Sequence, residues 1–309
     1  MGRYVARRLL QMIPVFIGTT LLIFLMVYSL PGDPVRALWG DRPVDPVALN
    51  QLRHEYWFDR PVLLQYWHYI SNVFTGNFGT SFVTGRKVTD VIGESFPVTL
   101  RLALVAFAIE IVIGLALGLL SGLNRGKIAD KFVLGLTLLL ISVPVFVLGY
   151  IFQTVFGNQL GWVTPTVQDS NDISQLILPG VVLGSLSFAY VARLSRTSIA
   201  ENMRADYIRT AVAKGLPRRR VIGVHLLRNS LIPVVTFLGT DLGALMGGAI
   251  VTEGIFNVHG IGNELYRSIN QSDNATVVGI VTVLVIIYLV TSLVVDLLYA
   301  ALDPRIRYV

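Results

Sequence analysis

The stretch from Asp206 to Leu216 reads DYIRTAVAKGL and forms a short basic segment between two long apolar runs. Asp206 can accept hydrogen bonds from free backbone amides as an N-cap, and the residues after it tolerate a helix. Gly215 suits the left-handed C-terminal position, and Pro217 blocks continuation. The pattern predicts a helix of two turns, about 12 Å long. Because so short a helix is marginal in water, we expect it to be held by packing, as a docking element would be.

The composition is that of a membrane protein. Hydrophobic residues make up 53% of the 309 residues and charged residues 14%, and the mean hydropathy is +0.65, too apolar for a soluble domain. Six apolar runs approach the roughly 20 residues that cross a bilayer; they cover residues 9–30, 98–123, 132–156, 176–194, 231–251 and 277–302. We predict an all-α integral membrane protein with six transmembrane helices. An even number puts both termini on one side.

Basic residues predict which side that is. Four segments hold 17 of the 25 Lys and Arg residues, namely the N-terminus, the loop around residues 125–131, the segment 193–228 and the C-terminal tail. The opposite face carries seven basic residues against twelve acidic ones. By the positive-inside rule, both termini are expected in the cytoplasm. The net charge of +6 then reflects topology and anionic lipid, and it gives no support for nucleic-acid binding.

The order of the runs predicts three parts. Residues 1–30 form the cytoplasmic N-terminal end and first span, residues 31–96 a small, mainly helical extracytoplasmic subdomain, and residues 97–309 a five-helix core. The subdomain contains an apolar stripe at helical spacing, Leu63, Trp67, Ile70 and Phe74, which is typical of a membrane interface. Glycines at every fourth position from Gly114, Gly180 and Gly239 predict faces where helices approach closely.

Two acidic residues fall near mid-membrane, where a charge costs about 2.5 to 3.5 kcal/mol on insertion scales, so both need partners or water. Glu110 shares the face of Gly114, which favours a buried interhelical hydrogen bond with a structural role. Asp241 points away from the glycine face. Together with Thr236 and Thr240 it could line a transport path, or it could make a structural contact to a partner subunit.

The basic segment resembles the EAA loop of ATP-binding-cassette (ABC) importer permeases. Ala211, Gly215 and Leu227 match the general form. The departures, RTAVAKGL at 209–216 and HLLRNSLIP at 225–233, are similar to the dipeptide, oligopeptide and nickel branch. Further motifs of that branch follow the whole chain: LPGDP at 30–34, DRP at 59–61, QYW at 65–67, GNFG at 76–79, Glu253-x-x-Phe256 and DLLYAALDPR at 296–305.

The resemblance implies the type I ABC importer permease fold and the subunit similar to DppB and OppB. It implies an inner-membrane permease for dipeptides or oligopeptides that pairs with a second, DppC- or OppC-like permease, with two ATPase subunits and with an external peptide-binding protein. ATP and Mg²⁺ would be bound by the ATPases, so no cofactor or metal site and no enzymatic activity are expected in this chain. The loop 196–230 would couple to the ATPases through Asp206, Tyr207, Arg209, Thr210, Ala211, Lys214, Gly215 and Leu216.

Other functions stay open at this point. In the same branch the substrate could be a nickel chelate or haem. An ion-coupled secondary transporter would use Glu110 and Asp241 as proton carriers, but no inverted repeat is visible. A membrane enzyme acting on lipid would need paired acids or a nucleophile motif near the interface, and none is present. The chain has no cysteine, and its four histidines are scattered, which argues against a metal site.

Overall fold

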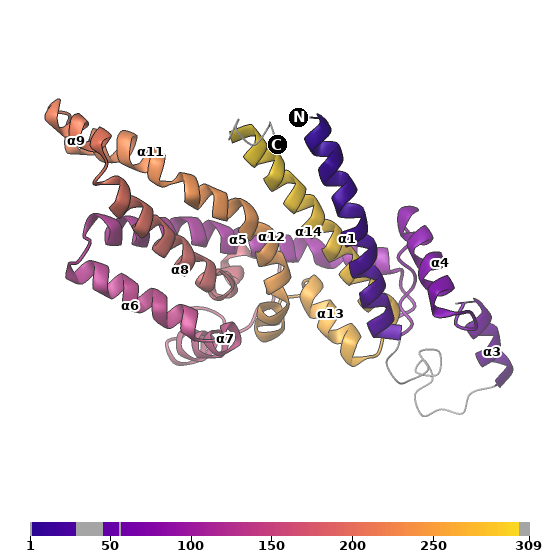
Figure 1. Ribbon diagram of the computed structural model, residues 1–309. Coiled ribbons are helices and arrows are strands. Elements are labelled where there is room, and N and C mark those ends of the chain that lie inside the picture. Colours follow the sequence, from indigo (N-terminus) through magenta and orange to yellow (C-terminus); the bar gives the residue numbers. More distant parts are fainter. Residues whose placement is uncertain (1, 29–45, 56, 303–309) are drawn as a thin grey trace. The chain divides into compact units, whose positions relative to one another are not determined.

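The computed structural model describes residues 2–28, 46–55 and 57–302, and these residues form helices with no β-strand. They group into two compact units, Met1–Thr99 with His259–Val309, and Leu100–Val258. Figure 1 shows the helices with their labels. Five helices are long and apolar enough to cross a membrane, and one bent pair makes a sixth span if it is counted as one. The predicted all-α membrane fold is confirmed. Within the predicted parts, residues 31–45 and 303–309 lie outside the described residues.

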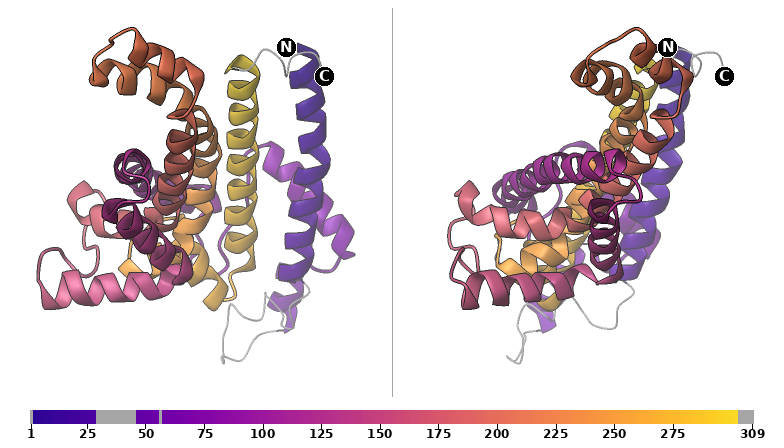
Figure 2. Two further views of the ribbon diagram at one scale, coloured as in Figure 1. Left: turned by 60° about the vertical axis from the view of Figure 1, so that its left-hand side comes forward. Right: turned by 90° about the vertical axis from the view of Figure 1, so that its left-hand side faces the viewer.

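In the first unit, α1 (Gly2–Tyr28) runs antiparallel to α14 (Asn274–Leu302). Near one end of the pair, Nη2 of Arg8 donates to Oγ of Ser292 at 3.2 Å. Near the other end, Phe24 and Val278 share one apolar cluster. The start of α1 and the end of α14 therefore lie at the same end of the pair, as Figure 2 shows for the indigo and yellow helices.

The predicted interfacial stripe lies on α4 (Val62–Phe74), which follows α3 (Pro46–Glu55). The buried face of α4 consists of Tyr66, Ile70 and Val73 and packs on α1, where the hydroxyls of Thr20 and Tyr66 lie 3.0 Å apart. The ring centroids of Phe74 and Phe16 lie 6.4 Å apart. The other stripe residues, Leu63, Trp67 and Phe74, are each more than 60% exposed, so an apolar face remains open to lipid.

A buried acid joins the loop before α5 to the start of α14. Asp273 is 3% exposed and comes directly before α14, after α13 (Ile261–Asn270). Its carboxylate accepts from Oγ of Ser81 at 2.5 Å, from the amide of Phe82 at 3.1 Å and from Oγ1 of Thr276 at 2.7 Å. The acid therefore satisfies donors that would otherwise be buried without partners. Sequence reasoning gave Asp273 no role.

The second unit begins within α5 (Val88–Leu123), which runs on from the first. The third apolar run, which we predicted as one span, is two helices, α6 (Ile128–Ser142) and α7 (Val145–Phe152), the latter continued by the π-helix η1 (Gln153–Gln159). The two halves are bent by 107°. Val143 is extended, which is the conformation that a residue before proline favours.

The glycine face of α5 packs against α8 (Ile177–Asn202), which follows the short η2 (Ile173–Leu176). A Cβ added at Gly114, Gly118 or Gly122 would collide with Val191, Ser195 or Ile199 of α8 in turn. From the other side, a Cβ at Gly184 would lie 3.0 Å from the carbonyl oxygen of Ala106. The prediction of close approach is confirmed for these two helices. At Gly247 of α12 (Ile232–Phe256), an added Cβ would meet open space.

Candidate docking site and transport path

Between α8 and α12 the chain folds into a compact segment of short helices, here called the cassette, residues 206–230. It contains α9 (Asp206–Ala213), α10 (Arg218–Arg220), the π-helix η3 (Val221–Leu226) and α11 (Leu227–Ser230). Ile208 and Ala211 of α9 are buried in one cluster with Val221 and Leu226 of η3 and Ile199 of α8. Leu119 and Leu123 of α5 and Leu216 pack on the same cluster. The short helix is thus held by packing, as expected.

The ends of α9 follow the predicted pattern at one end only. Gly215 has a φ of 72°, the left-handed conformation that glycine adopts most easily, and Pro217 follows it. At the start, the prediction of Asp206 as N-cap is wrong, because the N-cap position is Ala205 and Asp206 is the first helical residue. The Asp206 carboxylate is 95% exposed and lies 3.5 Å from the guanidinium of Arg209. An acid in the first turn still complements the helix dipole.

The predicted coupling residues divide between two faces of the cassette. Ala211 is buried and Leu216 is partly buried, and both pack inward. The other six are exposed: Asp206, Tyr207, Arg209, Thr210, Lys214 and Gly215. The Tyr207 hydroxyl donates to Oδ1 of Asn202 at 2.6 Å, which fixes that ring at the turn between α8 and α9. The outer face is therefore polar, and three arginines of α10 extend it as a basic surface.

Sequence reasoning missed one residue of the outer face. Val212 is 60% exposed although it stands four positions after the buried Ile208. Residues four apart on a helix share a face, so the spacing alone would have placed Val212 inside. The cassette turns sharply after Gly215 and leaves this side of α9 uncovered. Val212 adds an apolar contact point to a polar surface, a combination suited to a partner protein.

The predicted path residues all lie on α12. Thr236 and Thr240 are exposed, and Oγ1 of Thr240 donates to the carbonyl oxygen of Phe237 at 2.8 Å. Asp241 is half-buried. Its Oδ2 is enclosed and makes no hydrogen bond within the described residues. The two threonines therefore mark an open face of α12, and Asp241 lies at its edge with one oxygen turned into the unit.

Glu110 of α5 is fully buried, and both of its carboxylate oxygens lack a hydrogen bond of ordinary geometry in the described part of the chain. The carboxylate of Asp241 on α12 lies close enough to interact electrostatically with the carboxyl group of Glu110. The burial predicted for Glu110 is confirmed, but the predicted interhelical hydrogen bond is not formed within the described residues. Sequence reasoning had weighed the two residues separately and did not bring them together.

Comparison with known proteins places the whole chain in one family. Residues 114–308 match the model of the binding-protein-dependent transport system inner membrane component, and residues 1–103 match the model of its N-terminal region. The chain belongs to this family. Its members are transport components of the inner membrane, so the chain is a multi-pass membrane permease and not an enzyme.

Full-length relatives agree with this assignment. The chain is 38% identical over 308 residues to the glutathione transport system permease protein GsiC of Escherichia coli K12, covering 100% of both chains. The same identity and coverage hold for GsiC of Salmonella typhimurium LT2. Among solved structures, an inward-facing MetNI methionine ABC transporter chain matches with a TM-score of 0.57 at 20% identity. That match covers 69% of this chain and 96% of the other, and it supports the permease fold.

Proposed function

We propose that this permease moves dipeptides or oligopeptides through an ABC importer built from four kinds of subunit. A second, similar permease would complete the path, two ATPases would bind ATP and Mg²⁺, and an external binding protein would deliver the peptide. The glutathione transport named for the relatives supports a peptide-like substrate, because glutathione is a tripeptide analogue with a free amino group. The branch motifs along the chain point to the same class of substrate.

The cassette is the proposed contact with the ATPases. A single observation carries this proposal: a helix of eight residues, too short to be stable alone, is held on the ends of α5 and α8 while its polar face stays exposed. A surface that is rigidly held but uncovered is suited to transmit the movement of a partner. ATP-driven closure of the ATPases would move α9, and the cassette would pass that movement to α8 and α12.

Asp241, Thr236 and Thr240 are the proposed path residues. The two threonines are exposed on α12, and the Asp241 carboxylate could meet the ammonium group of a peptide when the path opens. For orientation, we propose that the cassette and both termini are cytoplasmic, in accord with the 17 basic residues that gather on those segments. The antiparallel α1 and α14 are compatible with this topology.

The proposal is tested by transport in a reconstituted system. The permease pair, the ATPases and the binding protein are placed in liposomes, and ATP-dependent uptake of radiolabelled dialanine and glutathione is measured beside haem and a nickel chelate. Saturable uptake of a peptide that requires ATP is the expected result. Uptake of haem or nickel chelate alone would assign the chain to another substrate of the branch, and uptake driven by an ion gradient without ATP would contradict the proposal.

A further inference from the structure

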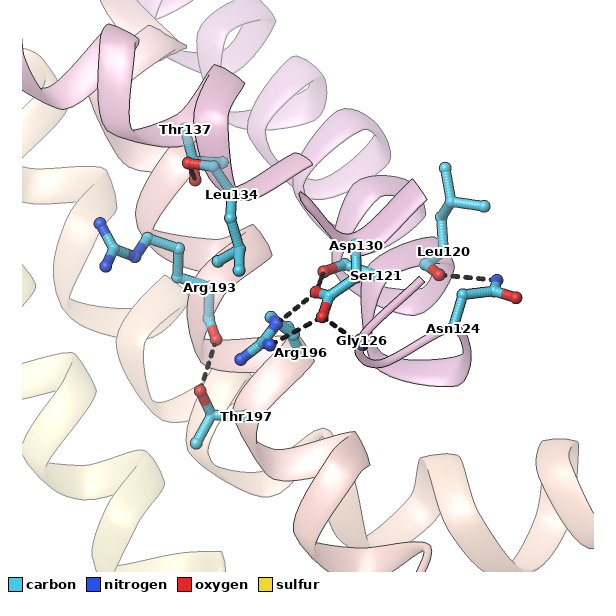
Figure 3. A network of polar contacts seen from close by, with 10 residues as sticks. All are labelled: Leu120, Ser121, Asn124, Gly126, Asp130, Leu134, Thr137, Arg193, Arg196 and Thr197. Atoms are coloured by element: carbon cyan, nitrogen blue, oxygen red, sulfur yellow. Dashed lines mark hydrogen bonds and ion pairs between the residues drawn. The ribbon is translucent and has the colours of Figure 1, made fainter. Parts of the chain in front are cut away.

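One buried ion pair lies beside the cassette and has no part in the function proposed so far. Asp130, the third residue of α6, is 2% exposed. Its Oδ1 accepts from Nε of Arg196 at 2.6 Å and from the hydroxyl of Ser121, and its Oδ2 accepts from Nη2 of Arg196 at 2.9 Å and from the amide of Gly126 at 2.8 Å. Figure 3 shows the carboxylate between these groups.

The pair ties three helices together at one end. Ser121 lies near the end of α5, Gly126 in the turn to α6, and Arg196 on α8. Gly126 has a φ of 82°, so the turn itself depends on a conformation that glycine favours. The Arg196 guanidinium meets the carboxylate with two parallel hydrogen bonds, which fixes the angle between the groups as well as their distance. Each oxygen of Asp130 has two donors, so no acceptor is left unsatisfied.

The same end of these helices carries the cassette. Ile199, three residues after Arg196 on α8, belongs to the cluster that buries α9, and Leu119 and Leu123 on either side of Ser121 pack on that cluster. On α5, Gly122 approaches Ile199 so closely that a Cβ would not fit. The cassette therefore rests on α5 and α8, and the ion pair adds α6 to them one helical turn away.

We propose that Asp130 and Arg196 are a positioning pair that makes the ends of α5, α6 and α8 move as one body with the cassette. Without the pair, a displacement of the cassette would be partly absorbed by sliding of α6 and of the turn at Gly126 against α8. With the pair in place, the displacement of the cassette is transmitted to the membrane-spanning helices α5, α6 and α8. A buried ion pair is a poor source of net stability, so its geometric role is the more informative one. This inference rests on the proposed coupling function of the cassette.

The test separates docking from transmission. Asp130→Asn puts an amide donor among groups that already donate, and Arg196→Gln removes the two-pronged contact. Both variants should keep the ATPases bound at wild-type stoichiometry and keep ATP hydrolysis, while peptide transported per ATP hydrolysed falls by about fivefold or more, the lower range of measured coupling effects. Arg196→Lys keeps the charge but has a single ammonium head, so its loss should be intermediate.

Two matched controls come from the same helix. Arg193 lies one turn before Arg196, is exposed and makes no ion pair within the described residues, and Glu201 is exposed near the end of α8. Arg193→Gln and Glu201→Gln should leave peptide transported per ATP unchanged. A charge reversal of the pair is not a rescue, because Ser121 and Gly126 would still donate toward position 130.

Three results would overturn the inference. The first is a normal ratio of transport to ATP hydrolysis in Asp130→Asn and Arg196→Gln. The second is loss of the ATPases from these variants, since the pair would then only support the docking surface. If Asp130→Asn fails to insert, the test uses Ser121→Ala and Arg196→Lys instead. The third overturning result is then a normal amount of peptide transported per ATP hydrolysed in both of these variants. The proposal that the cassette docks the ATPases is tested separately. It fails if a Gly215 variant binds the ATPases as the wild type does.

Discussion

Gly215 ends α9 with a φ of 72°, and a Cβ added there would have no atom within 4 Å. Any cost of Gly215→Ala therefore comes from the backbone alone, about 1 to 2 kcal/mol for a residue forced into the left-handed region. Because α9 has only eight residues, we expect this strain to disturb the docking face and to reduce the ATPases that copurify with the permease pair, with insertion unchanged.

Gly223 is the matched control for that substitution. It lies in η3 of the same cassette, an added Cβ has open space there as well, and its φ is not positive. Gly223→Ala should retain the ATPases. Equal retention by both alanine variants, measured by quantitative pull-down, would show that the end of α9 does not matter for docking.

Substitution of Asp241 tests the proposed transport path. Asp241→Asn keeps the size of the side chain and removes its charge, so assembly should be preserved while uptake of peptides with a free amino terminus falls and ATP hydrolysis persists. Glu110→Gln is the control, because Glu110 is fully buried and cannot meet substrate in this conformation. Its preference for free over acetylated amino termini should match that of the wild type. A loss of assembly in Asp241→Asn, or wild-type selectivity, would remove Asp241 from the path.

For single residues, the sequence predicted a conformation that the backbone determines, and it missed burial and exposure that the surrounding segments determine. Gly215 could be assigned because glycine before proline marks a helix end in any context. The burial of Asp273 could not, since it is set by Ser81 and Phe82, which are distant in the chain. The exposure of Val212 could not either, because it depends on how the cassette folds around α9. The proximity of Glu110 and Asp241 could not be predicted either, because it depends on how α5 and α12 are arranged within one unit.

Among the elements, the contact of α5 with α8 makes the clearest demand on side-chain size. A Cβ at Gly118 would overlap Ser195 and lie 2.9 Å from the carbonyl oxygen of Ala192, a backbone atom that cannot turn aside. Gly118→Ala should therefore destabilise the permease by about 1 to 3 kcal/mol, the usual cost of overpacking. The measurement is the melting temperature of the purified permease pair in detergent.

Gly135 provides the opposite case on α6. An added Cβ meets nothing within 4 Å, and alanine is a better helix residue than glycine by about 1 kcal/mol. Gly135→Ala should leave the melting temperature unchanged or raise it. If Gly118→Ala melted like the wild type, the close approach of α5 and α8 would not be what holds these helices together.

The bend between α6 and α7 shows why element boundaries are harder to predict than element types. The run 132–156 is apolar throughout, and hydropathy alone makes it one span. The signal for the bend was Pro144, yet Pro14 and Pro97 stand inside unbroken helices, α1 and α5. What distinguishes Pro144 is the extended Val143 before it, whereas the residues before Pro14 and Pro97 stay helical, so a proline in the sequence does not by itself predict a bend.

For the molecule as a whole, the topology can be read with single cysteines, since the natural chain has none. Pro217, Asp169 and Asn270 are all exposed, so labelling efficiency will depend on the side of the membrane. A membrane-impermeant maleimide on intact cells should label Asp169→Cys and Asn270→Cys, and it should label Pro217→Cys only after the membrane is permeabilised. Labelling of Pro217→Cys in intact cells would contradict the proposed orientation and place the cassette outside.

The organisation of the whole chain was predictable in its apolar runs and not in its units. Hydropathy located the spans, because each must satisfy its backbone inside the bilayer. It could not show that residues 1–99 group with 259–309, a division that passes through α5 between Thr99 and Leu100. Contacts such as those of Asp273 with Ser81 and Phe82 define that unit, and they join residues nearly two hundred positions apart.

The seating of α4 on α1 has a consequence for the surrounding lipid. Phe74 reaches Phe16, twelve residues before the end of α1 at Tyr28, and at 1.5 Å per residue this is about 18 Å along the helix. Around the Tyr28 end, α4 therefore joins α1 and α14, while at the Arg8 end α1 and α14 meet without it. Where α4 covers α1, the surrounding lipid therefore meets the exposed apolar side chains of α4, Leu63, Trp67 and Phe74, in place of α1.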